Sequence, residues 1–598
     1  MTRTRRLLRL DALRDDRGFA LAMAIVFGVV IVLMAATSLA VATSGLKKAD
    51  GDQDFNGAMA AAYAGLEDYQ ARLSNDNSYQ QYGNPSAPFS AGSTLRLPIG
   101  TQSNPAFGTG ATGSWAGVPG SAGTASFRYE VDNSTYLATG TLRLRVTGKV
   151  GSSVRSLTAD LRQQGFIDFV YFTDYEMQDP ELSGASVDCV RYAWAGRPGG
   201  SQNPCGNIAF ASGDLINGPS HSNDTMRICD ATFKGSVTTS NNPASGLRYL
   251  NRTSSDANCA DPTFQIGTQP AYRAVIGMPS TNSDMKRETR SDLPADVPRP
   301  GCLYTGPTSI VFNAGGTMTV RSPFTKFTTT TGDTASGGSN TAAACGQPGT
   351  SGGRLGSTGG ATVPVPENNL VYVQNVPAVT TDKNATTPAA LPATCSNALG
   401  YPIASETAPT IASGCAYGSR NGDAFVSGDL HGQVTVASEN YVYVTGDLKY
   451  VDSNEDILGL VGQNAVWVWN PMKRSNSGTN RDPRYSYTAL NAGSGRRIDA
   501  SILSVDKTFQ VQNVGVGGAR GTLTVNGAIA QKFRGTVFAS GPDEQRRQQS
   551  GGYVKSYNYD QRLRYLAPPK YLSPVTTTYG VTVLQEVAGG YDADGRAR

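Results

Sequence analysis

A long apolar run near the N-terminus constrains the fold of this chain more than any other feature. From Phe19 to Val41 there are 23 residues without a charge, and most of them are apolar. About 20 such residues are enough for a helix to cross the hydrocarbon core of a membrane, whereas the apolar part of a secretory signal usually has only about 7–15. The run therefore predicts a retained membrane-spanning helix. Small residues at Ala40–Ala42 keep a cleaved secretory signal open as the alternative.

The charges on the two sides of this run predict its orientation. Six arginines and three aspartates precede it, a net charge of +3, whereas Lys47 and Lys48 are followed at once by acidic residues. Because positively charged flanks stay on the cytoplasmic side, the N-terminus is expected inside the cell. The chain is then a single-pass protein in contact with the lipids of the cytoplasmic membrane, and its body is extracellular.

The apolar run continues into a segment with one apolar face. Apolar residues recur there at spacings of three and four, the period of a helix that buries one side: Phe55, Met59, Ala62, Leu66, Tyr69 and Leu73. No proline occurs from Phe19 to Leu73, so one helix of roughly 80 Å is expected to include both segments. A cleaved signal has no use for such a continuation, whereas a filament subunit does.

Two motifs in this region resemble the N-terminus of type IV pilins, and in particular the PilX-type minor pilins in their large Gram-positive, actinobacterial form. They are "RGF" at residues 17–19 and "AMAAAYAGLEDYQARL" at residues 58–73. The resemblance implies that a prepilin peptidase cleaves between Gly18 and Phe19 and that Phe19 is N-methylated. It also implies that the retained helix packs against other pilins, so the expected partners are other pilins, pilus assembly proteins and the prepilin peptidase.

The fifth residue after the expected cleavage site departs from the pattern of pilins of the filament shaft. Those pilins carry Glu there, which neutralises the N-terminal amine of a neighbouring subunit, whereas this chain has Met23. An unpaired amine in an apolar core is costly, so Met23 argues against an abundant shaft subunit. A minor pilin at a filament tip and a permanent membrane anchor are both compatible with Met23.

Beyond the helix, alternation of apolar and polar residues predicts an antiparallel sheet. "SFRYEVD" (126–132) and "TLRLRV" (141–146) both have the period of two that a half-buried strand requires. A long helix followed by such a sheet is the plan of a pilin head. We therefore expect a leader at 1–18, a transmembrane segment at 19–44 and a pilin-like domain of helix and sheet at 45–165.

The rest of the chain predicts a large β-rich extracellular domain at 166–585 and a flexible tail at 586–598. Short elements recur in it, such as "FKGSVTTS" (233–240), "LHGQVTVAS" (430–438) and "FRGTVFAS" (533–540). Regular glycine corners between short strands favour a parallel β-solenoid, with a β-sandwich as the second possibility. The expected fold class is α+β and mostly β: the long transmembrane α-helix, the pilin-like sheet and then this β-rich domain.

Eight cysteines, all beyond the apolar run, predict an oxidised exported domain with up to four disulfides. They are Cys189, Cys205, Cys229, Cys259, Cys302, Cys345, Cys395 and Cys415. The first bridges to expect are Cys189–Cys205 and Cys395–Cys415, because both close short loops. Buried free thiols are the alternative.

No residue pattern points to catalysis, a cofactor or a metal. His221 lies in "GPSHSND", which is more typical of a polar turn than of a catalytic triad, and His431 is expected to face solvent. "DSNED" (452–456) has the spacing of a calcium loop but lacks its glycine. Beyond the leader the chain has almost no net charge, so nucleic acid is not an expected partner.

Aromatic residues alternate with valines at two places in the body. Trp467 and Trp469 form one such stretch, and Tyr441 and Tyr443 form the other. Two interpretations stay open: a strand pair buried on both faces, or an aromatic ledge that binds a sugar or a protein.

Together these features predict a non-enzymatic minor pilin of a type IV pilus-like system. It is expected first in the membrane and then in a surface filament or at its tip, with roles in pilus assembly and in adhesion to a surface ligand. The alternatives are a permanently anchored surface binding protein and, third, a polysaccharide-active enzyme on a β-solenoid. Such an enzyme needs a pair of carboxylates, which the sequence does not single out.

Overall fold

The computed structural model describes residues 16–598 except for short stretches, namely 100–102, 110–112, 137–140, 164, 200–203, 252–259, 295–296, 298, 336–342, 387–396, 408–416, 480, 492, 543–547, 565 and 573–578. The chain divides into two compact units. We call the first the helix–sheet unit; it consists of Met1–Tyr136, Thr141–Arg162 and Val581–Arg598. We call the second the β unit; it consists of Leu137–Gly140 and Gln163–Gly580. The fold is thus α+β and mostly β, with one long helix followed by sheets.

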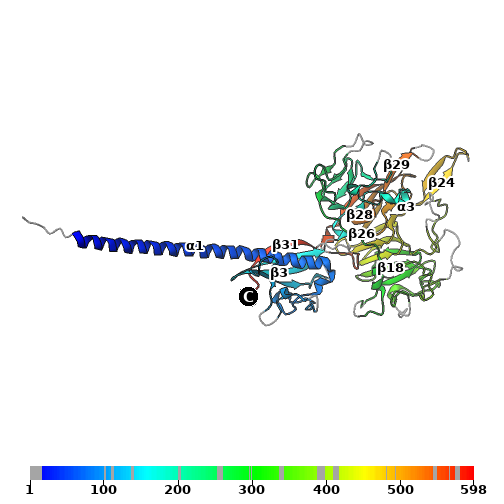
Figure 1. Cartoon of the computed structure of the whole chain (residues 1–598). Coiled ribbons are helices and arrows are strands. Elements are labelled where there is room, and N and C mark those ends of the chain that lie inside the picture. Colours follow the sequence, from blue (N-terminus) through cyan, green and yellow to red (C-terminus); the bar gives the residue numbers. More distant parts are fainter. Residues whose placement is uncertain are drawn as a thin grey trace, which may run out of the picture. The chain divides into compact units, whose positions relative to one another are not determined.

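Helix α1 (Asp16–Asn75) runs without a break through 60 residues (Figure 1). At 1.5 Å per residue it is about 90 Å long. The helix contains no proline, and Arg72 in its last turn complements the negative end of the helix dipole. One continuous helix through the apolar run and the segment after it was expected from the sequence, and the structure confirms it.

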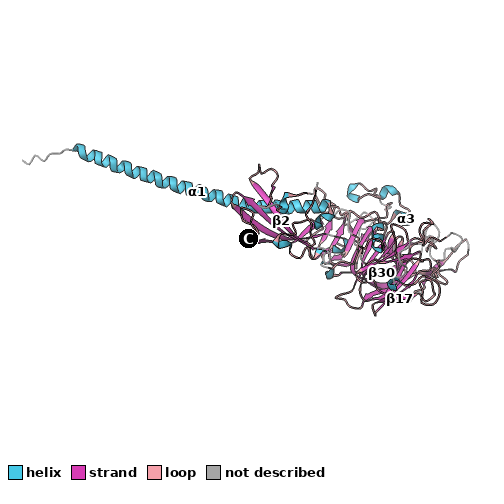
Figure 2. Cartoon of the chain, turned by 90° about the horizontal axis from the view of Figure 1, so that it is seen from below, coloured by secondary structure: helices cyan, strands magenta, loops and turns pink. Residues whose placement is uncertain are grey.

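The sheet of the helix–sheet unit has the strand order β1–β2–β3–β4–β31. Its strand β2 is labelled in Figure 2, where strands are magenta. Its first four strands pair antiparallel. β3 buries Leu142, Leu144 and Val146 and turns Arg143 to solvent, as the alternation in the sequence predicts. The strands are β1 (Ala116–Gly117), β2 (Ala125–Asp132), β3 (Thr141–Val150), β4 (Ser153–Gln163) and β31 (Tyr579–Val587).

The C-terminal residues differ from the flexible tail expected at 586–598. Glu586 belongs to β31, and its carboxylate accepts two hydrogen bonds from Arg155 of β4, at 2.8 and 2.7 Å. Further on, the backbone N–H of Gly590 donates to the Ser156 hydroxyl at 3.0 Å. The tail is therefore held to β4 by hydrogen bonds between residues more than 400 positions apart, which local composition does not reveal.

Most strands of the β unit lie in parallel ladders, in which each strand is hydrogen-bonded to the strand on either side. Ladder A contains, in spatial order, β14 (Cys302–Thr305), β18 (Asn369–Gln374), β20 (Gln433–Ser438), β22 (Ile457–Gly462), β26 (Arg496–Ser504), β28 (Gly518–Phe533), β5 (Tyr171–Tyr175), β8 (Ser220–Ser222), β11 (Val237–Thr239) and β13 (Ala271–Tyr272).

Two further ladders are also parallel. Ladder B contains β15 (Thr308–Asn313), β19 (Ala424–Leu430), β21 (Tyr441–Tyr450), β23 (Ala465–Val468) and β27 (Phe509–Val511). Ladder C starts from β28 and continues through β30 (Gln548–Tyr559), β7 (Leu215–Asn217), β10 (Thr232–Phe233) and β12 (Thr263–Phe264).

A column of β-branched residues explains the register of ladder B. Ile310, Val426, Val444, Val468 and Val511 are successive partners across its five strands. All five are fully buried. A shift of one residue in any strand would move the isoleucine or valine of that strand to the opposite face, so burial of this column fixes the pairing.

Early and late parts of the β unit meet inside the ladders. In ladder A, Phe172 of β5 is the partner of Ala530 of β28. In ladder C, Leu215 of β7 is the partner of Ser556 of β30. We call this junction the seam of the β unit, because early and late strands of its chain are neighbours there.

The remaining elements are short. Antiparallel hairpins join β15 to β16 (Thr317–Arg321) and β17 (Ala361–Pro364), β29 (Phe538–Pro542) to β30, and β24 (Met472–Asn476) to β25 (Tyr485–Ala489). A small parallel pair consists of β6 (Ala209–Phe210) and β9 (Arg227–Ile228), and α3 (Pro180–Ser183) is a single helical turn.

Candidate assembly surface on the N-terminal helix

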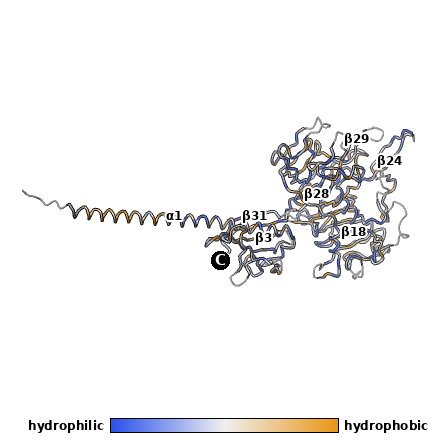
Figure 3. Tube along the Cα trace, viewed as in Figure 1, coloured by the Kyte–Doolittle hydropathy of each residue, from blue (hydrophilic) through white to orange (hydrophobic). Residues whose placement is uncertain are grey.

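The first half of α1 exposes a continuous apolar surface. Between Leu21 and Leu46 its large apolar side chains are 42% to 73% exposed. The most apolar 18-residue window of Ala20–Leu73 has a mean hydropathy of 2.7, and none of that window is buried. The tube is orange, the hydrophobic colour, along the first part of α1 (Figure 3). By length and composition this part of α1 fits a membrane anchor. A helix with such a surface is not stable in water unless lipid or other helices cover it.

Two hydroxyl groups in the apolar part of α1 are satisfied by the helix itself. Thr37 Oγ1 donates to the carbonyl of Leu33 at 2.9 Å, and Thr43 Oγ1 donates to the carbonyl of Leu39 at 2.8 Å. In hydrocarbon a hydroxyl without a partner is costly, so these bonds to the preceding turn make both threonines compatible with a lipid environment.

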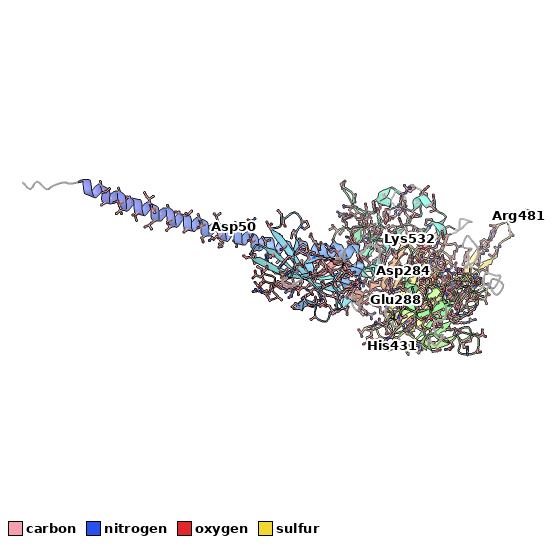
Figure 4. All side chains as sticks on the ribbon, turned by 60° about the horizontal axis from the view of Figure 1, so that its bottom comes forward. Asp50, Asp284, Glu288, His431, Arg481 and Lys532 are labelled. Carbon is pink, nitrogen blue, oxygen red and sulfur yellow. A yellow bond between two sulfur atoms is a disulfide. The ribbon has the colours of Figure 1, made fainter. Side chains whose placement is uncertain are left out.

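A charged boundary ends the apolar surface. Lys47 and Lys48 are exposed, and exposed Asp50 and Asp52 follow them (Asp50 is labelled in Figure 4). Ionic side chains are excluded from the hydrocarbon core, so the boundary sets the end of any membrane-spanning part of α1.

The second half of α1 packs on its own sheet. Of the residues in the predicted apolar stripe, Ala62, Leu66, Tyr69 and Leu73 are buried. Met59 is partly buried, and Phe55 is 50% exposed. The stripe is thus buried at its C-terminal end. At the other end, the Arg155 guanidinium lies over the ring of Phe55, 4.2 Å from the centroid.

The spacing of apolar residues along the helix did not predict the residues at the tight contact between helix and sheet. Ala58 and Ala61 are buried, and a Cβ added to Gly148 of β3 would lie 2.0 Å from the carbonyl oxygen of Ala58. A Cβ added to Gly65 of α1 would lie 2.7 Å from side-chain atoms of both Phe127 and Val146. Small residues on both elements therefore let the backbones approach. The alanine-rich composition of the helix was the available signal.

An aromatic cluster fixes the C-terminal end of α1. The ring centroid of Tyr69 lies 5.4 Å from that of Tyr79 and 5.0 Å from that of Tyr129. The Tyr129 hydroxyl donates to the Asp68 carboxylate at 3.1 Å, and Arg72 donates to the same carboxylate at 2.9 Å. Burial raises the pKa of Tyr69 well above its usual value. This end of the helix is rigidly held, in contrast to its exposed N-terminal half.

The disulfides agree in part with the sequence. The predicted bridge Cys189–Cys205 is present, and Cys302–Cys345 is a second bridge that loop length alone did not single out. Cys229 is disulfide-bonded as well. Cys259, Cys395 and Cys415 lie outside the described residues, so the bridge Cys395–Cys415 stays a prediction.

His221 is a buried structural residue. Its Nδ1 is 2.9 Å from the Thr238 hydroxyl and its Nε2 is 3.0 Å from the Asn223 side-chain oxygen. Burial lowers the pKa of His221 to about 4. Asp224, which follows it in the sequence, instead forms a buried ion pair with Arg197. His221 lies in strand β8 and not in the turn that was expected, although its hydrogen bonds fit a structural polar residue better than a triad.

His431 lies beside a cavity of about 420 Å³ that sequence reasoning did not anticipate. Its Nδ1 is 3.2 Å from Asp456, and Glu367 and Glu455 line the same cavity. The Asp456 carboxylate also accepts from the backbone N–H groups of Gly432 and Asp452, at 2.7 and 2.6 Å. It is thus used to close the turn in "DSNED". Among the described residues, no three His, Cys, Asp or Glu side chains are grouped to hold a metal ion.

The aromatic residues of ladder B are covered. Tyr443, Trp467 and Trp469 are buried, and Tyr401 stacks on Phe425 with ring centroids 4.2 Å apart. Of the two interpretations, burial on both faces is the one that these side chains show.

The chain matches no protein-family model and no curated protein. Among solved structures it is similar to the crystal structure of the competence-associated pilin ComZ from Thermus thermophilus. The identity is 11%, the TM-score is 0.24, and 89% of this chain and 97% of that chain are covered. A likeness at this TM-score decides nothing about the fold or the function of this chain.

Proposed function

We propose that this chain is a minor pilin of a type IV pilus-like system, anchored in the cytoplasmic membrane before it joins a surface filament or its tip. The observation that carries the proposal is the two-part helix α1. Its first half exposes apolar side chains, and its second half packs on an antiparallel sheet. One helix can then serve first in lipid and later among the helices of other pilins, because both surroundings are apolar.

Within this proposal the parallel ladders of the β unit are coils of a β-solenoid that presents a binding surface outside the cell. Parallel pairing of short strands is the pattern of stacked coils, whereas a β-sandwich is built from antiparallel strands. The β unit is too large to repeat densely along a filament shaft, and Met23 lacks the carboxylate that a shaft subunit uses. A few copies at the filament tip, acting in assembly and adhesion, fit both features.

The proposed role does not include catalysis. Assembly and binding depend on apolar helix contacts and on the surface of the β unit. The two alternatives are a permanent membrane anchor with the same β unit and a polysaccharide-active enzyme. The cavity beside His431, which Glu367 and Glu455 line, is one place where an enzyme could bring two carboxylates to a substrate.

Processing of the leader gives the first test. Gly18→Leu is expected to leave an uncleaved precursor in the membrane fraction. Gly28→Leu is the matched control, because a Cβ at Gly28 meets no atom within 4 Å. N-terminal analysis of extracted protein should find Phe19 in the wild type and in the control, and the leader in Gly18→Leu. A wild-type N-terminus near Ser44 would identify a secretory signal and overturn the proposal.

Localisation gives the second test. Immunogold labelling of sheared filaments should place the chain at filament ends, and deletion should reduce the number of filaments. Label confined to membranes, with unchanged filaments in the deletion strain, would show a permanent anchor instead. Turnover of a cell-wall polysaccharide by the full chain, abolished by Glu367→Gln or Glu455→Gln, would show an enzyme.

A further inference from the structure

A lysine and an aspartate meet at the seam of the β unit. Lys555 lies in β30, and Asp214 immediately precedes β7, its neighbour in ladder C. The Nζ atom of Lys555 is 2.6 Å from Oδ2 of Asp214, although the two residues are 341 positions apart. The backbone N–H of Ala211 donates to the same Oδ2 at 3.0 Å and so fixes the carboxylate.

The pair is largely removed from solvent. The Lys555 and Asp214 side chains are only 15% and 10% exposed. Both line a small cavity of about 240 Å³ whose other walls include Val537, Phe538 and Tyr553. An ion pair loses its hydration in such a place, so its charged form is poorly stabilised.

A second pair of charges interacts with the first. Arg534 is buried, lies 3.7 Å from the centroid of the Phe210 ring and donates to Glu176 at 2.8 Å. Both Arg534 and Glu176 act electrostatically on Lys555, and Arg534 also acts on Asp214. Burial lowers the pKa of Lys555 and raises the pKa of Glu176. The burial of the cluster therefore favours a neutral amine at Lys555.

We infer that Lys555 and Asp214 condense to an amide bond that joins β30 covalently to the start of β7. The proton passes from Nζ to the carboxylate, which gives a free amine and a carboxylic acid. The Nζ lone pair then attacks Cγ, the bond from Cγ to one oxygen breaks, and one water molecule leaves. Nothing is oxidised or reduced, and no co-reactant is needed.

The neighbouring groups assist this reaction. Negative charge develops on the Asp214 oxygens during the attack, and the positive charge of Arg534 stabilises it. The protons released by the amine leave with the departing oxygen as water, so the step needs no further acid. The seam holds the reacting atoms together before reaction, which removes most of the entropic cost of bringing them into contact.

The bond would close the β unit on itself. Its early and late strands are otherwise joined at the seam by the backbone hydrogen bonds of the pairs β30–β7 and β28–β5. With the amide bond, a cut in a loop between residues 214 and 555 does not separate the strands. This gain in durability suits an extracellular domain, but the inference does not depend on the proposed pilin function.

The mass of the full chain tests the bond. Protein extracted from membranes is reduced and alkylated, so that disulfides do not contribute, and the wild type is compared with Lys555→Arg and Lys532→Arg. Lys532 is the matched control because its pair with Asp506, at 3.3 Å, is more exposed, 33% and 35% (Lys532 is labelled in Figure 4). Processing at the N-terminus is common to all three chains and cancels in the comparison.

The expected result is that the wild type and Lys532→Arg each lack the mass of one water, whereas Lys555→Arg has its full mass. A digest of the wild type should also yield a branched peptide that joins the segments around Asp214 and Lys555. If Lys555→Arg does not fold, this peptide alone decides the question. Unbranched peptides containing a free Lys555, or a bond at another residue, would overturn the inference.

Discussion

The closest backbone contact between α1 and its sheet is the most sensitive point of the helix–sheet unit. At Gly148 the substitution to Ala adds a Cβ only 2.0 Å from the Ala58 carbonyl oxygen and 2.3 Å from the Ala62 nitrogen. Ordinary contacts of a Cβ begin at about 3.4 Å, so helix and strand must separate by more than 1 Å. The obstructing atoms are backbone, and no side-chain rotation can relieve the overlap.

The expected cost follows from what this separation exposes. Overpacking by one methyl group usually costs about 1–3 kcal/mol when side chains can adjust. Here the shift also loosens the burial of Ala62 and Leu66, so we expect about 3 kcal/mol or more for Gly148→Ala. Gly117→Ala in β1 is the control, because its Cβ meets no atom within 4 Å; its effect should stay within about 0.5 kcal/mol.

Hydrogen exchange of the full chain in detergent measures the effect where it acts. In Gly148→Ala the amides from Ala58 to Leu73 should lose protection, while the amides of ladder B in the β unit keep theirs. The denaturant concentration at the midpoint of unfolding of the helix–sheet unit should be lower for Gly148→Ala than for Gly117→Ala. Equal protection of α1 in Gly148→Ala and Gly117→Ala would show that the helix does not rest on β3 as described.

Three more predictions concern buried polar groups and the disulfides. Arg145 donates two hydrogen bonds to the buried Glu130 of β2, at 2.5 and 2.8 Å. Arg145→Met leaves this carboxylate without that cation and should lower the free energy of unfolding by about 3–5 kcal/mol, measured by denaturation. The pKa of His221 is about 4 in the folded chain and 6.5 as the reference value, so the unfolded chain binds this proton at a higher pH than the folded chain does. The free energy of unfolding should therefore fall by about 3 kcal/mol as the pH drops from 6.5 to 4. Comparing the pH dependence of unfolding between the wild type and His221→Gln isolates this contribution. Replacing both Cys302 and Cys345 by Ser opens a bridge with a sequence separation of 43 and should lower the free energy of unfolding by about 4 kcal/mol, measured by denaturation.

Local patterns in the sequence were enough to predict α1, β2 and β3 of the helix–sheet unit. The uncharged run from Phe19 and the spacing of Ala62, Leu66 and Tyr69 gave one helix with one buried face, because helical period and burial are local properties. Phe55 has the right spacing and is half exposed, since spacing along a helix does not tell where the sheet ends. The tight contact at Gly148 depends on two elements about 90 residues apart in the sequence.

The sequence did not predict which strands pair when they are far apart along the chain. The expected flexible tail at 586–598 includes the end of β31, which completes the sheet beside β4 after the whole β unit has intervened. Many strands of the ladders, such as β10 and β12, have only two residues, too few for a recognisable alternation. His431, Glu367 and Glu455 share a cavity only because successive strands stack, and no spacing in the sequence encodes that neighbourhood.

The order of strands explains how a small helix–sheet unit can carry a large insertion. α1 packs on β2 and β3, with Gly148 and Val146 of β3 at the contact. The β unit leaves the sheet after β4 and returns to it at β31, the last two strands in the sheet order. The residues that hold the helix are therefore not those that hold the insertion. Changes in the length or surface of the β unit can then occur while the exposed apolar surface of α1 stays the same.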